Sequence, residues 1–338
     1  MAKKYVIPIF VTHMGCPFQC IFCNQQQISG KTKKADIEYL DTTVEDHLKT
    51  ISPQSKIQIG FYGGSFTGIP IETQQSLLKK ASKYVENGLI DGIRVSTRPD
   101  YISNDIIELL KKYNVNLVEL GVQSLDDEVL RLSKRGYESN TVYKAVQILK
   151  SNEMQFGIQV MTGLPGDTPE KSIQTAKKTA ELNPHTVRIY PTLVIKNTYL
   201  EIMFANNDYT PQSLDEAVEI CTKMLDIFDQ RNINVIRVGL QTTSDIKSGG
   251  DVIAGPFHPS FRQLVESQLL RKRIEKVIKK KKLMNMNEVI IETSLQNTSN
   301  IVGHKKSNAR YFNKKFNIGN IIIKRNSDLC GYDFRVIS

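Results

Sequence analysis

Three cysteines near the N-terminus have the type and spacing to hold a metal centre. Cys16, Cys20 and Cys23 lie in the short string CPFQCIFC, and the next cysteine in the chain is Cys221. A structural zinc site takes four ligands, and an electron-carrying iron–sulfur cluster takes four thiolates. A loop that supplies three thiolates therefore indicates a [4Fe–4S] cluster with one iron open to a small molecule. The alternatives are a zinc site with a distant fourth ligand and three unrelated buried cysteines.

The elements that must position these cysteines alternate in type as far as about residue 240. Short apolar segments predict strands at 5–11, 56–62, 92–96, 115–121, 156–162, 186–190 and 234–238. Amphipathic segments between them predict helices at 36–51, 71–86, 103–113, 139–152, 168–182 and 211–230. Such βα alternation predicts an α/β fold, a full or partial (β/α) barrel with its helices outside.

Several glycine-containing and polar segments follow these strands directly. They include the cysteine loop, Gly63-Gly64, the segment from Ser96, and Gly121 to Ser124. Active sites of such barrels lie at the carboxyl ends of the strands, so we expect these segments to share one mouth. Each segment taken alone is more often an ordinary turn.

The composition indicates a soluble cytoplasmic protein with a large and a small domain. A chain of 338 residues can bury a sizeable core. No apolar run reaches the eighteen or more residues of a membrane span, and the start MAKKYVIP lacks the features of a signal peptide. Cys221 and Cys330 show no disulfide pattern, which fits a reducing compartment.

The net charge of +10 is concentrated at the C-terminal end. Residues 270–338 hold sixteen Lys or Arg and five Asp or Glu, so the preceding residues are close to neutral. We expect a barrel core over 1–240, a helical extension over 241–282 and a small basic α/β region over 283–338. An anionic partner would bind at the basic end.

The cysteine spacing, with Phe22 before the third cysteine, resembles the radical S-adenosylmethionine (radical-SAM) superfamily. The resemblance implies that the amino and carboxylate groups of S-adenosylmethionine bind the open iron, with Phe22 beside the adenine. Reductive cleavage would then give a 5′-deoxyadenosyl radical. It also implies a low-potential electron donor such as flavodoxin or ferredoxin. Local packing of the loop is an equally good explanation of Phe22.

Two further segments resemble cofactor-binding parts of that superfamily. Gly63-Gly64 resembles its GGE segment, whose backbone binds the amino group of the cofactor; Ser65 replaces the Glu, so only the backbone role transfers. The string GVQS, followed by Arg135, is similar to a stretch shared by oxygen-independent coproporphyrinogen III oxidases and the catalytic subunit of Elongator. This implies that Gln123 contacts the ribose or carboxylate region and that Arg135 neutralises the carboxylate, a task for which a guanidinium is suited.

Weaker candidates for cofactor contact are Ser96 and Gln159. They stand where related enzymes often carry acidic residues. No catalytic residue beyond these binding positions is indicated.

Segments 187–195 and 254–265 resemble the Elongator catalytic subunit more than the porphyrinogen enzymes. The resemblance spans roughly residues 5–265 and implies modification of the wobble uridine of tRNA. Two features differ: the first cysteine gap is shorter, and fewer than eighty residues remain after 265 for an acetyltransferase domain. Two alternatives remain open. One is a radical-SAM reaction on a small metabolite such as a porphyrinogen, and the other is a non-catalytic iron–sulfur protein that binds or senses.

The basic end carries the candidate nucleic-acid contacts. These candidates are Lys279, Lys280, Lys281, Lys282, Lys305, Lys306 and Arg310. Tyr311 and Phe312 lie among them, and aromatic rings between cations suit stacked bases and a phosphate backbone. Gly303-His-Lys-Lys306 resembles the GxxG loop of KH modules without its second glycine. A solvated basic face is the alternative.

Overall fold

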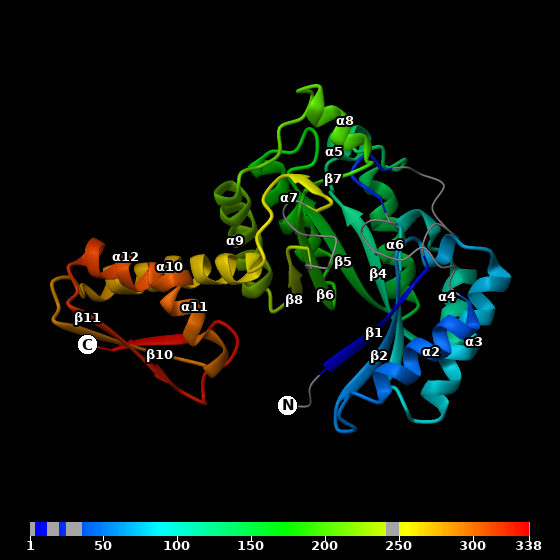
Figure 1. The fold of residues 1–338 in the computed structure, drawn as a ribbon, viewed down its shortest axis with the longest axis horizontal. Coiled ribbons are helices and arrows are strands. Elements are labelled where there is room, and N and C mark those ends of the chain that lie inside the picture. Colours follow the sequence, from blue (N-terminus) through cyan, green and yellow to red (C-terminus); the bar gives the residue numbers. More distant parts are fainter. Residues whose placement is uncertain (1–3, 12–19, 25–35, 241–249, 338) are drawn as a thin grey trace.

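A seven-stranded parallel sheet, curled into a half-barrel, forms the main part of the molecule (Figure 1). The computed structural model describes residues 4–11, 20–24, 36–240 and 250–337. The strand order is β1-β2-β3-β4-β5-β6-β8, and every neighbouring pair is parallel. The predicted α/β partial barrel is confirmed.

The seven strands lie close to their predicted positions. They are β1 (Lys4–Phe10), β2 (Lys56–Tyr62), β3 (Gly92–Thr97), β4 (Val115–Gln123), β5 (Gln155–Thr162), β6 (Thr186–Pro191) and β8 (Asn234–Val238). The helices between them are α2 (Ile37–Leu48), α3 (Ile71–Glu86), α4 (Asn104–Lys112), α5 (Asp127–Leu132), α6 (Ser139–Ser151), α7 (Pro169–Glu181), α8 (Tyr199–Ala205) and α9 (Leu214–Gln230). A two-stranded ribbon joins β7 (Val194–Ile195) to β9 (Val252–Ala254).

Alternation along each strand separates an apolar face from a polar one. On β2, Ile57, Ile59 and Phe61 are buried in the main core beneath the helices. Gln58 and Tyr62 lie on the opposite, concave face, because successive side chains of a strand point to opposite sides. Figure 1 shows the helices on the convex side of the sheet, which is the side that the apolar residues cover.

Local sequence fixes where the helices begin. The Ser213 hydroxyl accepts from the backbone of Glu216, whose carboxylate accepts from the backbone of Ser213. This reciprocal cap starts α9 at Leu214, three residues after the expected start at 211. Helices α5 and α8 were not predicted, because each is too short to show clear periodicity.

The C-terminal part has a separate small core. Helix α10 (Phe261–Lys281) packs its first half on the main core through Phe261, Val265 and Leu269. Its second half packs through Ile274 and Ile278 into a cluster with the last sheet, of order β11-β10-β12. The further elements are β10 (Glu288–Thr293), α11 (Thr298–Val302), α12 (Ser307–Phe316), β11 (Asn320–Arg325) and β12 (Phe334–Ile337). Helix α10 thus connects the two parts (Figure 1).

No helix in the described part of the chain is both long and apolar enough to cross a membrane. No disulfide joins the four described cysteines, Cys20, Cys23, Cys221 and Cys330.

Candidate active site

The described part of the cysteine loop is held close to the carboxyl ends of the strands. The backbone N–H of Cys23 donates to the carbonyl oxygen of Cys20 at 3.0 Å. Ile21 is bound on both sides: its N–H lies 3.4 Å from the carbonyl oxygen of Ser133, and its carbonyl accepts from Leu200 at 2.8 Å. Cys16 lies outside the described residues. The loop is therefore fixed by α5 and α8, the two short helices that the sequence did not predict.

Two buried arginines face the sulfur of Cys20. Arg135 Nη1 lies 3.0 Å from Cys20 Sγ, and Arg98 Nη1 lies 3.9 Å from it. Cys20, Arg98 and Arg135 are each about 5% exposed or less. Arg98 is in turn held by Asp100, with Nη2 and Oδ2 2.8 Å apart. Hydrogen bonds from nearby donors orient a metal ligand and tune the centre that it holds.

Arg135 has three partners within the fold, Cys20, Gly121 and Tyr137. Its Nη2 donates to the carbonyl oxygen of Gly121 at 2.5 Å and to the hydroxyl of Tyr137 at 2.9 Å. Burial alone would lower the pKa of Arg135, but Tyr137 and Cys20 outweigh it and raise that pKa. Burial also raises the pKa of Tyr137. Arg135 therefore stays charged and Tyr137 stays protonated.

The predicted cofactor glycines lie beside the start of the cysteine loop. Strand β2 ends with Tyr62, whose carbonyl oxygen accepts from Val11 N–H at 2.7 Å. A Cβ on Gly64 would come within 3.4 Å of the carbonyl oxygen of Val11. Gly63 has a φ of +87°, a conformation that glycine adopts without cost. The tight turn brings its backbone next to Val11, the last described residue before the cysteine loop.

Ser96 and Gln159 are brought together on the concave face. Gln159 Nε2 donates to Ser96 Oγ at 3.3 Å, across strand β4. In the register Gln159 pairs with Gly121, whose missing side chain leaves space beside it, and Ser96 pairs with Glu119, two residues earlier on β4. The two weaker candidates therefore form one polar pair inside the half-barrel.

Gln123 stands at an irregularity of β4. Its φ is +70°, and the pairing of β4 with β5 shifts between Gly121 and Gln123. A Cβ on Gly121 would lie 3.1 Å from Gln123 Nε2, so the amide folds back over that glycine. Left-handed backbone in a non-glycine residue is strained and is found where surrounding contacts fix it, often at functional sites.

Phe22 is half-buried and packs against a small cluster of Ile21, Val194, Leu200 and Tyr209. This contact is the local packing named as the alternative for Phe22. Its place beside an adenine stays a prediction.

Arg98 and Tyr137 belong to this site and were not predicted. Arg98 lies in the segment from Ser96 that the sequence analysis had marked, whereas Tyr137 lies two residues after the marked Arg135. The sequence feature that could have indicated Arg98 is an arginine directly after a predicted strand, followed by Pro99 and the acidic Asp100. The type of residue was visible in the sequence, but its direction toward Cys20 depends on the fold.

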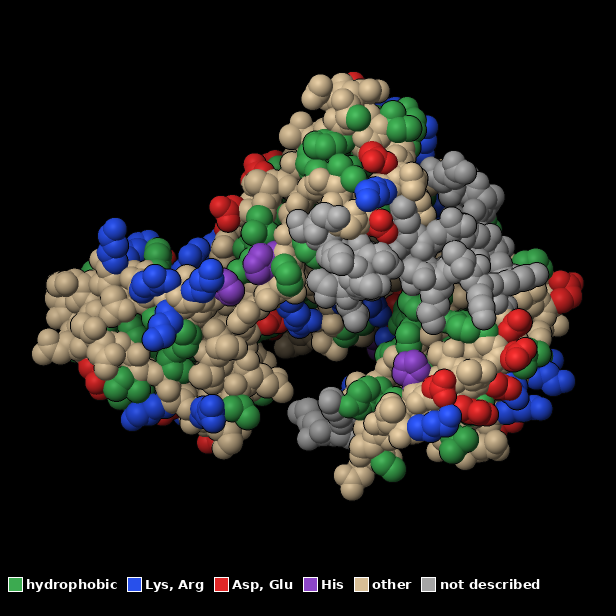
Figure 2. Space-filling view, in the orientation of Figure 1, with side chains coloured by type: hydrophobic (Ala, Val, Ile, Leu, Met, Phe, Trp, Pro, Cys, Tyr) green, Lys and Arg blue, Asp and Glu red, His purple; other side chains and the backbone are tan. Residues whose placement is uncertain are grey.

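The candidate nucleic-acid residues lie in two places, at the C-terminal end of α10 and at the start of α12 with the turn before it. Lys279 to Lys282 are at that end of α10, where Lys279 pairs with Glu275 at 2.6 Å. Lys305 and Lys306 lie in the turn between α11 and α12, with φ values of +50° and +62°, and the carbonyl of Lys305 accepts from Arg310. Figure 2 shows Lys and Arg side chains spread along this side of the C-terminal part.

The aromatic pair predicted among these cations has only one accessible member. Phe312 is fully buried in the small core, so its predicted role in stacking is wrong. The helical period places it on the inner face of α12. Tyr311 is half-buried, with Arg271 and Lys315 about 5 Å from its ring centre.

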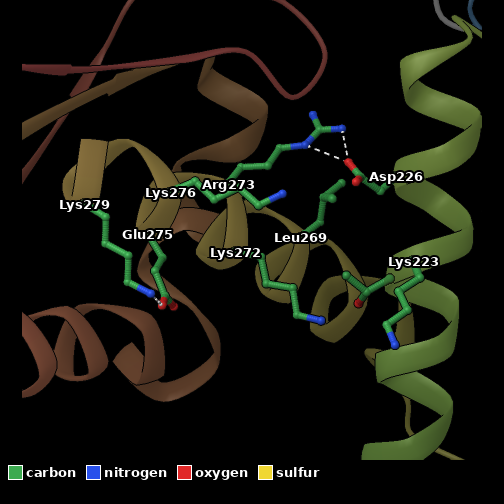
Figure 3. Close-up of a pocket in the computed structure, with 9 residues that line it drawn as sticks. Lys223, Asp226, Leu269, Lys272, Arg273, Glu275, Lys276 and Lys279 are labelled. Carbon is green, nitrogen blue, oxygen red and sulfur yellow. Dashed lines mark hydrogen bonds and ion pairs between the residues drawn. The ribbon is translucent and has the colours of Figure 1, made fainter. Parts of the chain in front are cut away.

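A pocket of about 290 Å³ lies between α9 and α10 (Figure 3). It is lined by Thr222, Lys223, Asp226, Leu269, Lys272, Arg273, Glu275, Lys276 and Lys279. Most of its cations are paired with nearby acids: Arg273 lies 2.5 Å from Asp226, and Lys272 lies 2.5 Å from Glu219. The pocket is an ion-paired groove that lies apart from the cysteine loop.

Two family models match the chain. The model of the radical SAM superfamily matches residues 10–179, and the model of the Radical_SAM C-terminal domain matches residues 184–271. The first model alone covers half of the chain, so this protein belongs to the radical SAM superfamily and is a radical-SAM enzyme.

Within the superfamily, the chain is similar to Elongator-type proteins, as the sequence motifs predicted. It is 32% identical over 256 residues to the tRNA uridine(34) acetyltransferase of Methanocaldococcus infernus, covering 64% of this chain and 48% of that protein. It is 28% identical over 191 residues to Elongator complex protein 3 of Saccharomyces cerevisiae, covering 50% of this chain and 34% of that one. The chain thus spans about half the length of the acetyltransferase.

The fold is also similar to a solved structure of this type. The archaeal M. infernus Elp3 with an N-terminal deletion superposes with a TM-score of 0.62 at 24% identity. The match covers 84% of this chain and 64% of that chain.

Proposed function

We propose that Cys16, Cys20 and Cys23 hold a [4Fe–4S] cluster with one open iron, at which S-adenosylmethionine binds and is cleaved. When bound, the cluster would supply the electron that releases methionine and the 5′-deoxyadenosyl radical. The observation that carries the proposal is Arg135 Nη1 at 3.0 Å from the buried Cys20 Sγ. A guanidinium in that position fits a thiolate ligand, and hydrogen bonds to the sulfurs tune an iron–sulfur centre.

The chain itself would then position the cofactor. Gly63 and Gly64 offer backbone groups at the end of β2, next to the cysteine loop. Gln123 is the polar side chain at the end of β4. Arg135 was predicted to neutralise the cofactor carboxylate, but in this structure it is bound to Cys20, Gly121 and Tyr137. We therefore propose that its main task is to hold Cys20, and that any contact with the carboxylate uses its remaining hydrogens.

We propose RNA, and tRNA in particular, as the substrate, with a flavodoxin or ferredoxin as the electron donor. Support comes from two sources. Relatives over much of the chain are named for uridine 34 of tRNA. The charge excess lies at residues 270–338, where it could neutralise a phosphate backbone.

The experiment that tests the proposal has two measurements. Anaerobically reconstituted protein with dithionite and S-adenosylmethionine should release 5′-deoxyadenosine, and the Cys20→Ala variant should release none. Mass spectrometry of tRNA nucleosides from cells with and without the protein should then show one modified nucleoside that depends on it. Release of 5′-deoxyadenosine without any RNA difference would support the chemistry and contradict the substrate.

A further inference from the structure

The concave face of the half-barrel carries a layer of buried charge. Glu119 on β4 is 1% exposed, and its Oε1 accepts from Arg94 Nη1 of β3 and from Arg188 Nη2 of β6, each at 2.9 Å. Arg188 also donates to the hydroxyl of Tyr62 at 3.2 Å and lies 3.5 Å from that of Tyr190. None of these contacts involves the cysteine loop.

Glycine makes this layer possible. Gly157 of β5 stands between Glu119 and Thr186 in the register, and a Cβ there would lie 2.4 Å from Thr186 Oγ1. Its missing side chain allows Arg188 to reach across β5 to Glu119. In the register, Ser96 pairs with Glu119 and Gln159 pairs with Arg188, so the layer lies directly beside the Ser96–Gln159 pair on the concave face.

The layer contains more positive than negative charge. Arg94 and Arg188 both donate to Glu119, so two largely buried guanidiniums share one carboxylate. Burial alone would lower the pKa of Arg188, but Tyr190 and Glu119 raise it, so the guanidinium stays charged. Excess buried charge is costly unless an opposite charge or a ligand compensates it.

Hydrogen-bonding capacity is left over in the same place. Among the described residues, Glu119 Oε2 and Arg188 Nε are buried and have no hydrogen-bond partner. Gln58 and Glu119 accept hydrogen bonds from the guanidinium of Arg94. In Arg188, by contrast, the Nε donor has no acceptor, and Nη1 lies 3.5 Å from the hydroxyl of Tyr190. Burial, the largest effect, raises the pKa of the Tyr62 hydroxyl to about 12, so it stays a potential donor. Unmatched buried polar groups are uncommon and call for an explanation.

We propose that this layer, centred on Arg188 with Arg94 and Tyr62, binds an oxyanion group of the molecule on which the enzyme acts. A guanidinium fork matches a carboxylate or a phosphate, and the excess positive charge requires at least one negative charge. The proposal rests on the proposed function only in taking the half-barrel as the reaction chamber. The group would be a carboxylate of a small co-substrate or a phosphate of a nucleotide.

The test is to titrate the reconstituted full chain with anions and to measure its thermal unfolding midpoint at each anion concentration. Potassium acetate and potassium phosphate are compared with potassium chloride at matched ionic strength. We expect acetate, phosphate or both to raise the midpoint saturably, since a ligand that binds only the folded state stabilises it. A response to acetate alone identifies a carboxylate, and one to phosphate alone identifies a phosphate.

Variants locate the effect. Arg188→Gln should weaken the anion response about tenfold or more, as expected for the loss of a charged hydrogen bond. Arg94→Gln serves if that variant does not fold. Arg273→Gln, which removes an outward-facing guanidinium paired with Asp226, should keep the full response. An equal effect of chloride, or an unchanged response in Arg188→Gln and Arg94→Gln, would overturn the proposal. Because no turnover is needed, failure here leaves the cleavage of S-adenosylmethionine as a separate question.

Discussion

At the scale of single residues, the site depends on a chain of contacts that begins at a sulfur. Cys20 is held by Arg135, Arg135 by Tyr137 and the carbonyl of Gly121, and Arg98 by Asp100. Each guanidinium is buried, so its charge must be matched inside the protein. The network therefore stabilises the cysteine loop and makes the surroundings of the thiol electropositive at the same time.

Removing the central guanidinium should affect both roles. We expect Arg135→Gln to lower the free energy of unfolding by about 2 kcal/mol, because a charged hydrogen bond is removed and the carbonyl of Gly121 loses a donor. Iron bound per chain after reconstitution should fall as well. The matched control is Arg131→Gln, an exposed arginine on α5, four residues before Arg135. Urea unfolding and iron analysis measure the two effects, and wild-type values for Arg135→Gln would contradict the assigned role.

At the scale of elements, the sequence predicted the repeating framework and missed its exceptions. All seven parallel strands were expected, because their apolar runs are flanked by helical periodicity. The short α8, the β7–β9 ribbon and the turn between α11 and α12 were not, since each depends on tertiary contacts. The same limit applies to the site: Cys20 and Arg135 were visible as residue types, but the contact between them joins positions 115 residues apart.

Gln123 is an example of a residue whose type could be predicted from the sequence but whose conformation could not. Its motif was recognised from the sequence, but its left-handed backbone and the shift in β4 pairing were not. No propensity favours such a conformation for glutamine, so only the neighbouring strands can impose it.

Glu275 of α10 contacts Lys315 and Tyr311 of α12, and these contacts predict that the stability of the C-terminal part depends on pH. Burial alone would raise the pKa of Glu275, but Lys279, Lys315 and Tyr311 lower it from 4.5 to about 2. A carboxylate with a depressed pKa in the folded state stabilises above its unfolded pKa, and this stability is lost as the pH falls from about 4.5 toward 2.

The Glu275→Gln variant should therefore be less stable than the wild type at pH 6, and this difference should shrink as the pH falls toward 3. Urea midpoints across that range measure it. Glu288→Gln, at an exposed position of β10, is the control and should follow the wild type. A constant difference between Glu275→Gln and the wild type would contradict the assigned ion pairs.

At the scale of the whole molecule, two cores share one helix and carry different charge. The half-barrel is nearly neutral, and the basic excess lies at the C-terminal end, which α10 attaches to it. A polyanion could therefore be held on the C-terminal part while one of its groups reaches the half-barrel.

Neutralising the exposed lysines of the C-terminal part tests this arrangement. Replacing Lys280, Lys282, Lys305 and Lys306 by Gln should weaken tRNA binding and flatten its salt dependence, by roughly 0.7 to 0.9 in log–log slope for each phosphate that the protein no longer neutralises. Four exposed lysines of α3 and α4, at positions 79, 83, 111 and 112, give a control of equal charge change. Fluorescence anisotropy over a range of salt concentrations provides the slope. Equal weakening in both variants would show that only net charge matters and would contradict a binding face on the C-terminal part.

The central claim is a cluster with one iron that the polypeptide leaves open. The most direct measurement is the electron paramagnetic resonance spectrum of the reduced, anaerobically reconstituted protein before and after S-adenosylmethionine is added. We predict the signal of one [4Fe–4S] cluster per chain, whose g values shift when the cofactor is added. Zinc in place of iron, or a cluster signal that the cofactor leaves unchanged, would contradict the account.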